Sequence, residues 1–273
     1  MLELADLEDS LAHPSGSDSI GVQPRLLGET ERSMLKLCTL TGVDESTSFD
    51  WIIDTAQLHP RAEFGILLSV TADGSDHRYP SRAFIEKFAG AMQGAMVNTA
   101  VHICGRAVRM FVEGDSDIRA LAARFGRIQL NFNAQHVPFS YEELDGAIAS
   151  FSRPVITQHN EANACVAANI KAPNHHVLFD ASGGRGIHAK EWPKRLHGKL
   201  YGYAGGFGPE TLVFDLKGAQ DASAGQPFWI DMESRLRHEN WLDTSICESV
   251  LRCATAWADA EKHRHCQGRK IDG

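Results

Sequence analysis

Residues 127–159 read RIQLNFNAQHVPFSYEELDGAIASFSRPVITQH, and they contain one complete structural unit. The two ends of this segment, residues 127–132 and 154–159, are apolar runs of strand length. Between them, residues 141–151 carry apolar side chains at helical spacing, and Ser140 precedes them as a candidate N-cap. The segment therefore predicts a strand, a helix and a second strand parallel to the first.

The same rhythm extends over most of the chain. The apolar runs are continuous rather than alternating, which is typical of a parallel sheet covered by helices. About eight such runs are present, at residues 34–38, 64–70, 98–104, 127–132, 154–159, 175–180, 200–204 and 228–231. Helical spacing occurs between them, at residues 82–96, 116–125, 141–151 and 242–257. This pattern predicts an α/β protein with a parallel, eight-stranded (β/α)8 TIM barrel.

An open, doubly wound sheet shares this alternation of strands and helices. Such a sheet usually has fewer strands and a glycine fingerprint after the first strand, and the fingerprint is absent here. Residues 1–30 are rich in Asp, Glu, Ser and Gly, so we expect an N-terminal extension there. No linker-like segment interrupts the rest, which predicts one barrel domain over residues 31–273 with a polar C-terminal tail.

Composition narrows the classes of partner. Lys and Arg number 27 against 35 Asp and Glu, a formal charge of −8, which argues against nucleic acid or an anionic membrane as partner. No apolar run reaches the roughly 18 residues of a membrane span, and the start does not resemble a secretory signal. We therefore expect a cytoplasmic protein whose partner is a small-molecule substrate, and we leave a homo-oligomer open. The six cysteines form no CxxC pair, which favours reduced thiols.

Cofactor and metal signals are weak. Neither a phosphate-binding P-loop nor a dinucleotide fingerprint is present, so no cofactor is expected. His102 and Cys104 lie two apart on one predicted strand and share a face. The spacing supplies no third or fourth ligand, so we expect no metal either.

Polar residues at the predicted strand ends are the candidates for function, because barrels bind substrates at the C-terminal ends of their strands. Two glycine pairs, Gly183-Gly184 and Gly205-Gly206, directly follow predicted strands. Glycines allow backbone N–H groups to approach an anion closely, as in the phosphate sites of many barrels. Simple tight turns explain the same pairs equally well, and both interpretations stay open.

Cys38 and Asp180 are the candidates for proton transfer. A thiol at a strand end acts as a base if its pKa falls, although a buried cysteine is more often a small apolar residue. Asp180 ends the buried run 175–180, where a carboxyl group needs a partner or a function. A thiolate that removes a proton and a carboxylic acid that donates one would form a pair suited to isomerisation.

Short motifs follow the predicted strands in order. They are KLCTLT at 36–41, RYPS at 78–81, IQLN at 128–131, LFD at 178–180 followed by GGRG at 183–186, YAGGFGPE at 203–210, and DMES at 231–234. In order and spacing, these motifs resemble those of the phosphoribosylanthranilate isomerase family, which are (β/α)8 enzymes of tryptophan synthesis. KLCTLT resembles the family's K-x-C-G-x-T, and IQLN resembles its V-Q-L-H.

This resemblance implies an Amadori rearrangement, in which a phosphorylated aminoaldose becomes an aminoketose. It implies Cys38 as the general base at the sugar C2 and Asp180 as the general acid at the ring oxygen. It further implies that Gly205 and Gly206 hold the phosphate with the loop after the eighth strand, and that Arg78 lies near the substrate carboxylate or the catalytic centre. The full set of expected substrate-binding residues is Arg78, Gln129, Asn131, His159, Gly183, Gly184, Gly205, Gly206, Glu233 and Ser234.

The chain departs from the family pattern at three places. Thr39 replaces a glycine, the fifth strand ends in polar residues including His159, and Glu233 and Arg235 flank Ser234 where the family has S-S-G. A carboxylate is unfavourable at a phosphate site, so Arg235 either compensates its charge or binds Glu233 and closes the site. We therefore expect an isomerase acting on a phosphorylated or carboxylated molecule other than the family substrate.

The sequence leaves two alternatives open. A barrel that binds a small ligand without catalysis would be favoured by a blocked strand-8 mouth or by a Cys38 thiol turned away from it. A different barrel enzyme, a lyase or a hydrolase, would use His159 and Glu233 if both converged on the mouth.

Overall fold

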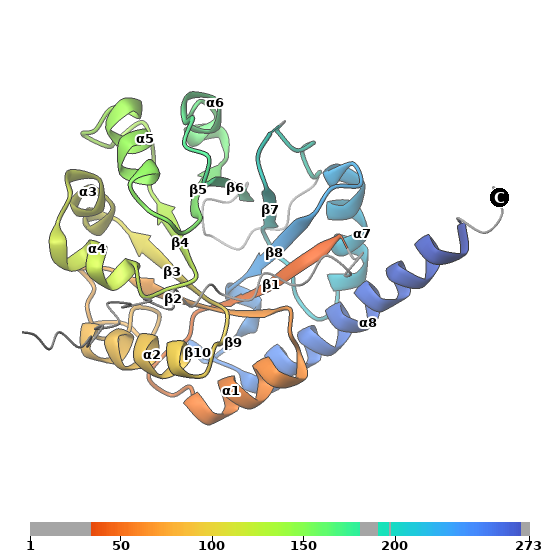
Figure 1. Ribbon diagram of the computed structural model, residues 1–273. Helices are drawn as coiled ribbons and strands as arrows, with labels where there is room; N and C mark the ends of the chain where they lie inside the picture. Colours follow the sequence, from red (N-terminus) through yellow and green to blue (C-terminus); the bar gives the residue numbers. More distant parts are fainter. Residues whose placement is uncertain (1–33, 181–190, 197, 269–273) are drawn as a thin grey trace, which may run out of the picture.

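The computed structural model describes residues 34–180, 191–196 and 198–268 (Figure 1). Eight parallel strands form a closed barrel in chain order, which confirms the fold predicted from the sequence. The strands are β1 (Leu35–Thr41), β2 (Ala62–Leu68), β3 (Thr99–Cys104), β4 (Arg127–Asn131), β5 (Val155–His159), β6 (His175–Asp180), β7 (Tyr201–Ala204) and β8 (Phe228–Met232). The expected N-terminal extension, residues 1–30, lies outside the described residues.

Helices surround the barrel (Figure 1). They are α1 (Phe49–Leu58), α2 (Arg82–Gly94), α3 (Arg106–Glu113), α4 (Ser116–Ala122), α5 (Tyr141–Ala149), α6 (Val166–Asn169), α7 (Leu212–Ser223) and α8 (Thr244–Gly268). The predicted N-cap of α5 is confirmed, because the Ser140 hydroxyl accepts from Glu143 N and the Glu143 carboxylate accepts from Ser140 N. None of the helices in the described part of the chain is long and apolar enough to cross a membrane.

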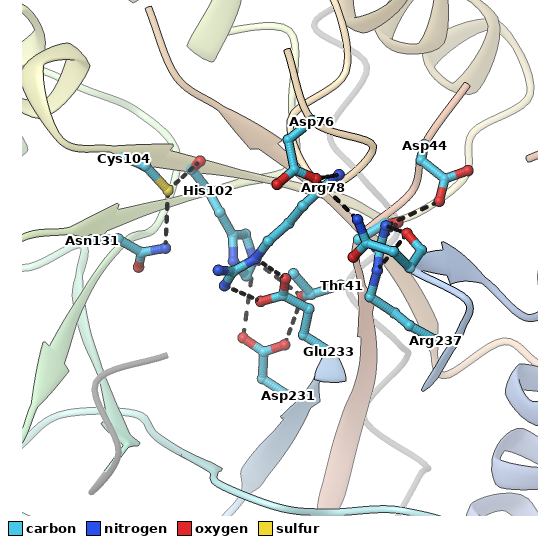
Figure 2. A network of polar contacts seen from close by, with 12 residues as sticks. Thr41, Asp44, Asp76, Arg78, His102, Cys104, Asn131, Asp231, Glu233 and Arg237 are labelled. Carbon is cyan, nitrogen blue, oxygen red and sulfur yellow. Dashed lines mark hydrogen bonds and ion pairs between the residues drawn. The ribbon is translucent and has the colours of Figure 1, made fainter. Parts of the chain in front are cut away.

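Short elements join the barrel strands to the helices at the mouth. Two 3-10 turns, η1 (Glu161–Asn163) and η2 (Ser234–Leu236), follow β5 and β8. After η2, the strands β9 (Arg237–His238) and β10 (Trp241–Leu242) form an antiparallel hairpin. Arg237 donates hydrogen bonds to Gly42 O at 2.8 Å and Asp44 Oδ2 at 3.2 Å, which anchors the hairpin to the loop after β1 (Figure 2).

Side chains alternate between the outside and the inside of the barrel. Outward side chains such as Leu40 and Phe64 join the large apolar core beneath the helices. A separate, smaller apolar cluster of Ile156, Leu178 and Trp229 fills part of the interior. This alternation decides which strand residues can reach the barrel mouth.

A buried ion pair fills the middle of the barrel. Arg127 Nε donates to Glu63 Oε1 at 2.8 Å, and the Thr39 hydroxyl donates to Glu63 Oε2 at 2.8 Å. The Arg127 guanidinium also lies 4.6 Å from the ring centroid of Trp229. Gly202 makes room for this indole, because a Cβ at that position would lie 2.1 Å from Trp229 Cε2. These contacts close the barrel below the mouth.

Candidate active site

A cavity opens at the C-terminal ends of the strands, and we call it the mouth cavity. Most of its lining is polar. It is lined by Thr41, Arg78, His102, Gln129, Asn131, Gln158, Leu178, Asp180, Ala204, Gly205, Gly206, Phe207, Asp231, Met232, Glu233 and Ser234. Eight residues expected from the sequence therefore meet here: Arg78, Gln129, Asn131, Asp180, Gly205, Gly206, Glu233 and Ser234.

The prediction that Cys38 is the catalytic base is wrong. Strand β1 does not end near Cys38 but continues to Thr41, where Thr41 pairs with Gly65. The hydroxyls of Thr39 and Thr41 are on the inside of the barrel, so Cys38 lies on the opposite face, toward Cys247 of α8. The Cys38 side chain is 1% exposed, and burial raises the pKa of its thiol well above the usual range.

His159 does not reach the mouth cavity either. Its neighbour Gln158 lines the cavity, and strand alternation turns the imidazole of His159 to the outer face of β5. There its ring centroid lies 6.3 Å from that of Tyr201, and its buried Nδ1 has no hydrogen-bond partner. Burial also lowers the pKa of His159. This placement overturns both its expected substrate-binding role and the alternative of a lyase or hydrolase using His159 with Glu233.

An ion pair crosses the rim of the mouth cavity (Figure 2). Arg78, in the loop between β2 and α2, binds both carboxylate oxygens of Glu233, through Nε and through Nη2, which lies 2.8 Å from Oε2. Of the two alternatives for Arg235, the contact with Glu233 is not formed, because Arg235 pairs with Glu210 at 2.9 Å instead. Glu233 is therefore neutralised by the arginine that the resemblance implies for substrate binding.

Asp180 and Asp231 both place a carboxyl group inside the barrel at the level of the mouth. Asp180 ends β6 and accepts a hydrogen bond from Gln158 Nε2 at 3.2 Å. Asp231 lies on β8 and accepts a hydrogen bond from the Thr41 hydroxyl at 2.6 Å. The strand between them, β7, pairs Ala204 with both residues, so the two carboxyl groups lie at one height in the barrel.

Burial strongly perturbs Asp231. Asp231 is 7% exposed, and desolvation raises the pKa of its carboxyl group to about 8. The hydrogen bond from Thr41 opposes this rise, and the negative charge of Glu233 adds to it. At neutral pH the group therefore holds its proton and presents a carboxylic acid to the cavity.

His102 and its neighbours form a hydrogen-bonded row on β3 and β4. Gln129 Nε2 lies 3.2 Å from His102 Nδ1 and 3.0 Å from Asn131 Oδ1. Burial lowers the pKa of His102 to about 3, so its imidazole is neutral. His102 Nε2 lies 3.5 Å from Thr41 Oγ1 and 4.0 Å from Asp231 Oδ2, which joins the row to the acid (Figure 2).

The glycine turn after β7 lines the opposite part of the cavity. Gly205 and Gly206 have φ angles of 117° and 78°, a left-handed conformation that favours glycine. Ser234 lines the same cavity from the loop after β8. The other expected glycines, Gly183 and Gly184, lie outside the described residues. Among the residues that the structure describes, no three His, Cys, Asp or Glu side chains are grouped to hold a metal ion.

Sequence reasoning missed Thr41, His102, Gln158 and Asp231 as site residues. The signal that would have found them is strand alternation. Once Asp180 is placed inside the barrel, every second residue of its strand also faces inside, and pairing with the neighbouring strands extends this assignment to them. Applying it requires the register between strands, which depends on pairing between distant segments. The sequence motifs show where strands lie but do not show which face of β1 points inward.

Comparison with known proteins supports the barrel and leaves the chemistry open. No family model matches the sequence, and no curated protein matches it. Monomeric variants of the dimeric phosphoribosylanthranilate isomerase from Thermotoga maritima are similar in structure, with a TM-score of 0.54 and 14% identity over 81% of this chain and 99% of that chain. A mandelate oxidase variant with benzoylformic acid has a TM-score of 0.50 and 12% identity over 86% of this chain and 78% of that chain. At these identities the similarity shows the TIM-barrel fold alone.

Proposed function

We propose that this protein is an enzyme that moves protons within a small polar substrate, using Asp231 as the acid and Asp180 as the base. The observation that carries the proposal is that both carboxyl groups line one cavity, from β8 and β6. Two strand spacings separate their Cα atoms by roughly 10 Å. Ala204 lies between them with a one-carbon side chain, which leaves room for a substrate.

The environments of the two groups support different roles. Asp231 keeps its proton near neutral pH because burial raises its pKa to about 8, so it suits the acid. Asp180 accepts a hydrogen bond from the Gln158 amide, which leaves an oxygen of the carboxyl group for a proton, and we assign it as the base. This assignment reverses the role that the family resemblance implied for Asp180. It also replaces Cys38 on β1 by Asp231 on the neighbouring strand β8. The two strands are paired at this level, because Thr39 of β1 pairs with Asp231 of β8.

The reaction that fits this pair best is the isomerisation of an aminoaldose, with its amine on C1, to an aminoketose. Asp231 gives its proton to the ring oxygen while the C1–O bond breaks and an iminium ion forms. Asp180 then takes the proton from C2, which produces an enolamine. The enolamine gains a proton at C1 and loses its hydroxyl proton, so the product is an isomer of the substrate and no oxidant or reductant is needed.

The substrate class is a phosphorylated aminosugar. Gly205, Gly206 and Ser234 line the same cavity as the two carboxyl groups. In many barrels the loops after the seventh and eighth strands hold a phosphate group. Backbone N–H groups in a left-handed glycine turn, together with a serine hydroxyl, are suitable donors for phosphate oxygens.

The test is turnover by the purified protein of a panel of phosphorylated aldosylamines that includes phosphoribosylanthranilate, with the ketose product followed by NMR. We expect Asp180→Asn and Asp231→Asn each to lower kcat by about 100-fold or more, the usual contribution of general acid–base groups. Cys38→Ala is the matched control and retains turnover. Absence of any isomerisation in the folded wild-type protein would overturn the proposal, as would full activity of either aspartate variant.

A second candidate function is ligand binding without catalysis. The Cys38 thiol faces away from the mouth cavity, and the Arg78–Glu233 pair crosses its rim, which are the features that favour this alternative. Calorimetric binding of the same compounds without turnover would support it and would contradict the enzymatic proposal.

A further inference from the structure

The interior of the barrel contains a row of polar side chains that runs toward Asp231 from the far side of the mouth. The row includes Cys104 on β3, Asn131 and Gln129 on β4, His102 on β3 and Thr41 on β1. None of these groups has a role in the proposed proton transfer. Their hydrogen bonds nevertheless all run in the same donor-to-acceptor direction. This direction follows from the group at one end of the row, which can only accept a hydrogen bond.

The main-chain carbonyl of His102 is that end, because a carbonyl oxygen only accepts hydrogen bonds. The Cys104 thiol donates to it at 3.4 Å, so Cys104 Sγ is left to accept a hydrogen bond from Asn131 Nδ2, also at 3.4 Å. The amide of Asn131 is thereby oriented with Oδ1 toward Gln129. Gln129 Nε2 donates to that oxygen at 3.0 Å.

The second N–H of the Gln129 amide points to His102 Nδ1 at 3.2 Å. A neutral imidazole has one protonated nitrogen, so an accepting Nδ1 leaves the proton on Nε2. His102 Nε2–H then faces Thr41 Oγ1 at 3.5 Å. The Thr41 hydroxyl in turn donates a hydrogen bond to Asp231 Oδ1 at 2.6 Å.

Gly65 makes this last step geometrically possible. Strand β2 lies between β1 and β3, and its residue at this level has no side chain. A Cβ on Gly65 would lie 2.6 Å from Thr41 Oγ1 and 3.2 Å from His102 Nε2. Thr41 and His102 therefore reach each other across a glycine.

We propose that Thr41 and His102 are positioning residues that hold Asp231 Oδ1 by this one-way row of donors, so that the proton transferred to the substrate resides on Oδ2. The inference rests on the proposed role of Asp231 as the acid. Thr41 occupies one oxygen with a short hydrogen bond, and the other oxygen remains available. The row thus selects one oxygen of the carboxyl group and fixes the side-chain rotamer.

Other charged groups face Asp231 and must be separated from this effect. Glu233, directly after β8, and Glu63 on β2 raise the pKa of Asp231, and Arg127 on β4 lowers it. His102 on β3 is neutral, so it acts through its hydrogen bond. Removing the Thr41 hydroxyl leaves all these charges in place, which makes Thr41 the position to test.

The experiment uses the full chain without substrate. Titration of Asp231, followed by 13C NMR of labelled aspartate, is expected to show a higher midpoint in Thr41→Val than in the wild type, because the variant loses a hydrogen bond to the carboxylate form. Thr41→Ser restores the hydroxyl and is expected to restore the wild-type midpoint. In turnover assays, Thr41→Val lowers kcat and leaves KM unchanged.

A second readout follows the direction of the row. The 15N NMR shifts of His102 are expected to report the Nε2–H tautomer in the wild type, and the Nδ1–H tautomer in Gln129→Glu, where a carboxylate accepts from Nδ1. An Nδ1–H tautomer in the wild type, or an unchanged Asp231 midpoint in Thr41→Val, would overturn the inference. Both results are obtained on the free protein, so a lack of turnover would refute only the proposed function.

Discussion

Asp231 and Cys38 lie on neighbouring strands, and the difference between them is the face of the barrel that each occupies. Asp231 lines the mouth cavity, where Thr41 donates to it, and Cys38 belongs to the apolar core under α8. Both groups are protonated at neutral pH, because burial raises both pKa values. Of these two groups, Asp231 lines the mouth cavity and Cys38 does not.

The environment of Cys38 predicts its reactivity. Thiols react as thiolates, so a buried thiol with a raised pKa is inert to alkylation in the folded protein. Cys165 is exposed and serves as the internal control. Brief treatment with iodoacetamide at pH 7.5, followed by mass spectrometry, is expected to modify Cys165 and to leave Cys38 unmodified until the protein is denatured. Equal modification of both thiols in the folded protein would contradict the placement of Cys38.

The raised pKa of Asp231 has a consequence for stability. The folded-state value of about 8 exceeds the usual value for an unfolded aspartate, about 3.9, so the folded protein binds more protons between these limits. Protonated Asp231 therefore contributes to the free energy of unfolding. This contribution is fully present below about pH 4, and it is lost as the pH rises through about 8, by at most about 1.4 kcal/mol per pH unit.

Asp231→Asn removes this dependence. We therefore expect the free energy of unfolding of Asp231→Asn, relative to the wild type, to increase between pH 5 and pH 8, as measured by urea denaturation. Asp54→Asn, on the exposed surface of α1, controls for the loss of one negative charge. A difference between Asp231→Asn and the wild type that stays constant with pH would show that Asp231 does not carry the raised pKa.

At the scale of elements, the sequence pattern predicted all eight strands but misplaced the end of the first. The apolar run suggested that β1 ends near Cys38, whereas pairing with β2 extends it to Thr41. The end of a strand depends on its neighbours in the sheet, which local periodicity does not contain. The helices α1, α3, α6 and α7 were not predicted, and α3 and α6 are short enough, at 8 and 4 residues, to leave little periodic signal.

Substitution of glycine by alanine is expected to have opposite effects on stability at two positions, Gly202 and Gly146. A methyl group on Gly202 of β7 would clash with the buried ring of Trp229, so Gly202→Ala is expected to destabilise the protein by about 2–3 kcal/mol. Gly146 lies on the exposed side of α5 with open space around it, so Gly146→Ala is expected to stabilise by about 0.5–1 kcal/mol. Urea denaturation of both variants checks the pair, and a neutral Gly202→Ala would contradict the described packing of the barrel interior.

At the scale of the whole molecule, closure of the barrel brings together residues that no sequence window contains. Glu63 and Arg127 are 64 positions apart, and they meet inside the barrel beside Trp229. The family resemblance indicated the barrel and the mouth, because the motifs follow the strand ends in order. It did not indicate this interior, or that Arg78 would be held by Glu233, because those contacts follow from side-chain packing across the closed ring.

The buried pair predicts a non-additive response to mutation. Arg127→Met leaves the Glu63 carboxylate buried without its cation, and we expect it to lower the free energy of unfolding by about 3–5 kcal/mol. The double variant Glu63→Leu with Arg127→Met removes both charges and is expected to be more stable than Arg127→Met alone. A double variant that loses the sum of the two single effects would show that the two side chains do not interact.

The pH dependence of kcat for isomerisation, measured in the wild type and in Cys38→Ala, distinguishes a carboxylic acid at Asp231 from a thiolate base at Cys38. A carboxylic acid must be protonated to act, so we expect kcat to fall as the pH rises through about 8, in both proteins alike. A thiolate base must be deprotonated to act, so it would make kcat rise with pH. A kcat that increases with pH in this range, together with loss of activity in Cys38→Ala, would show that Cys38 and not Asp231 is the catalytic group.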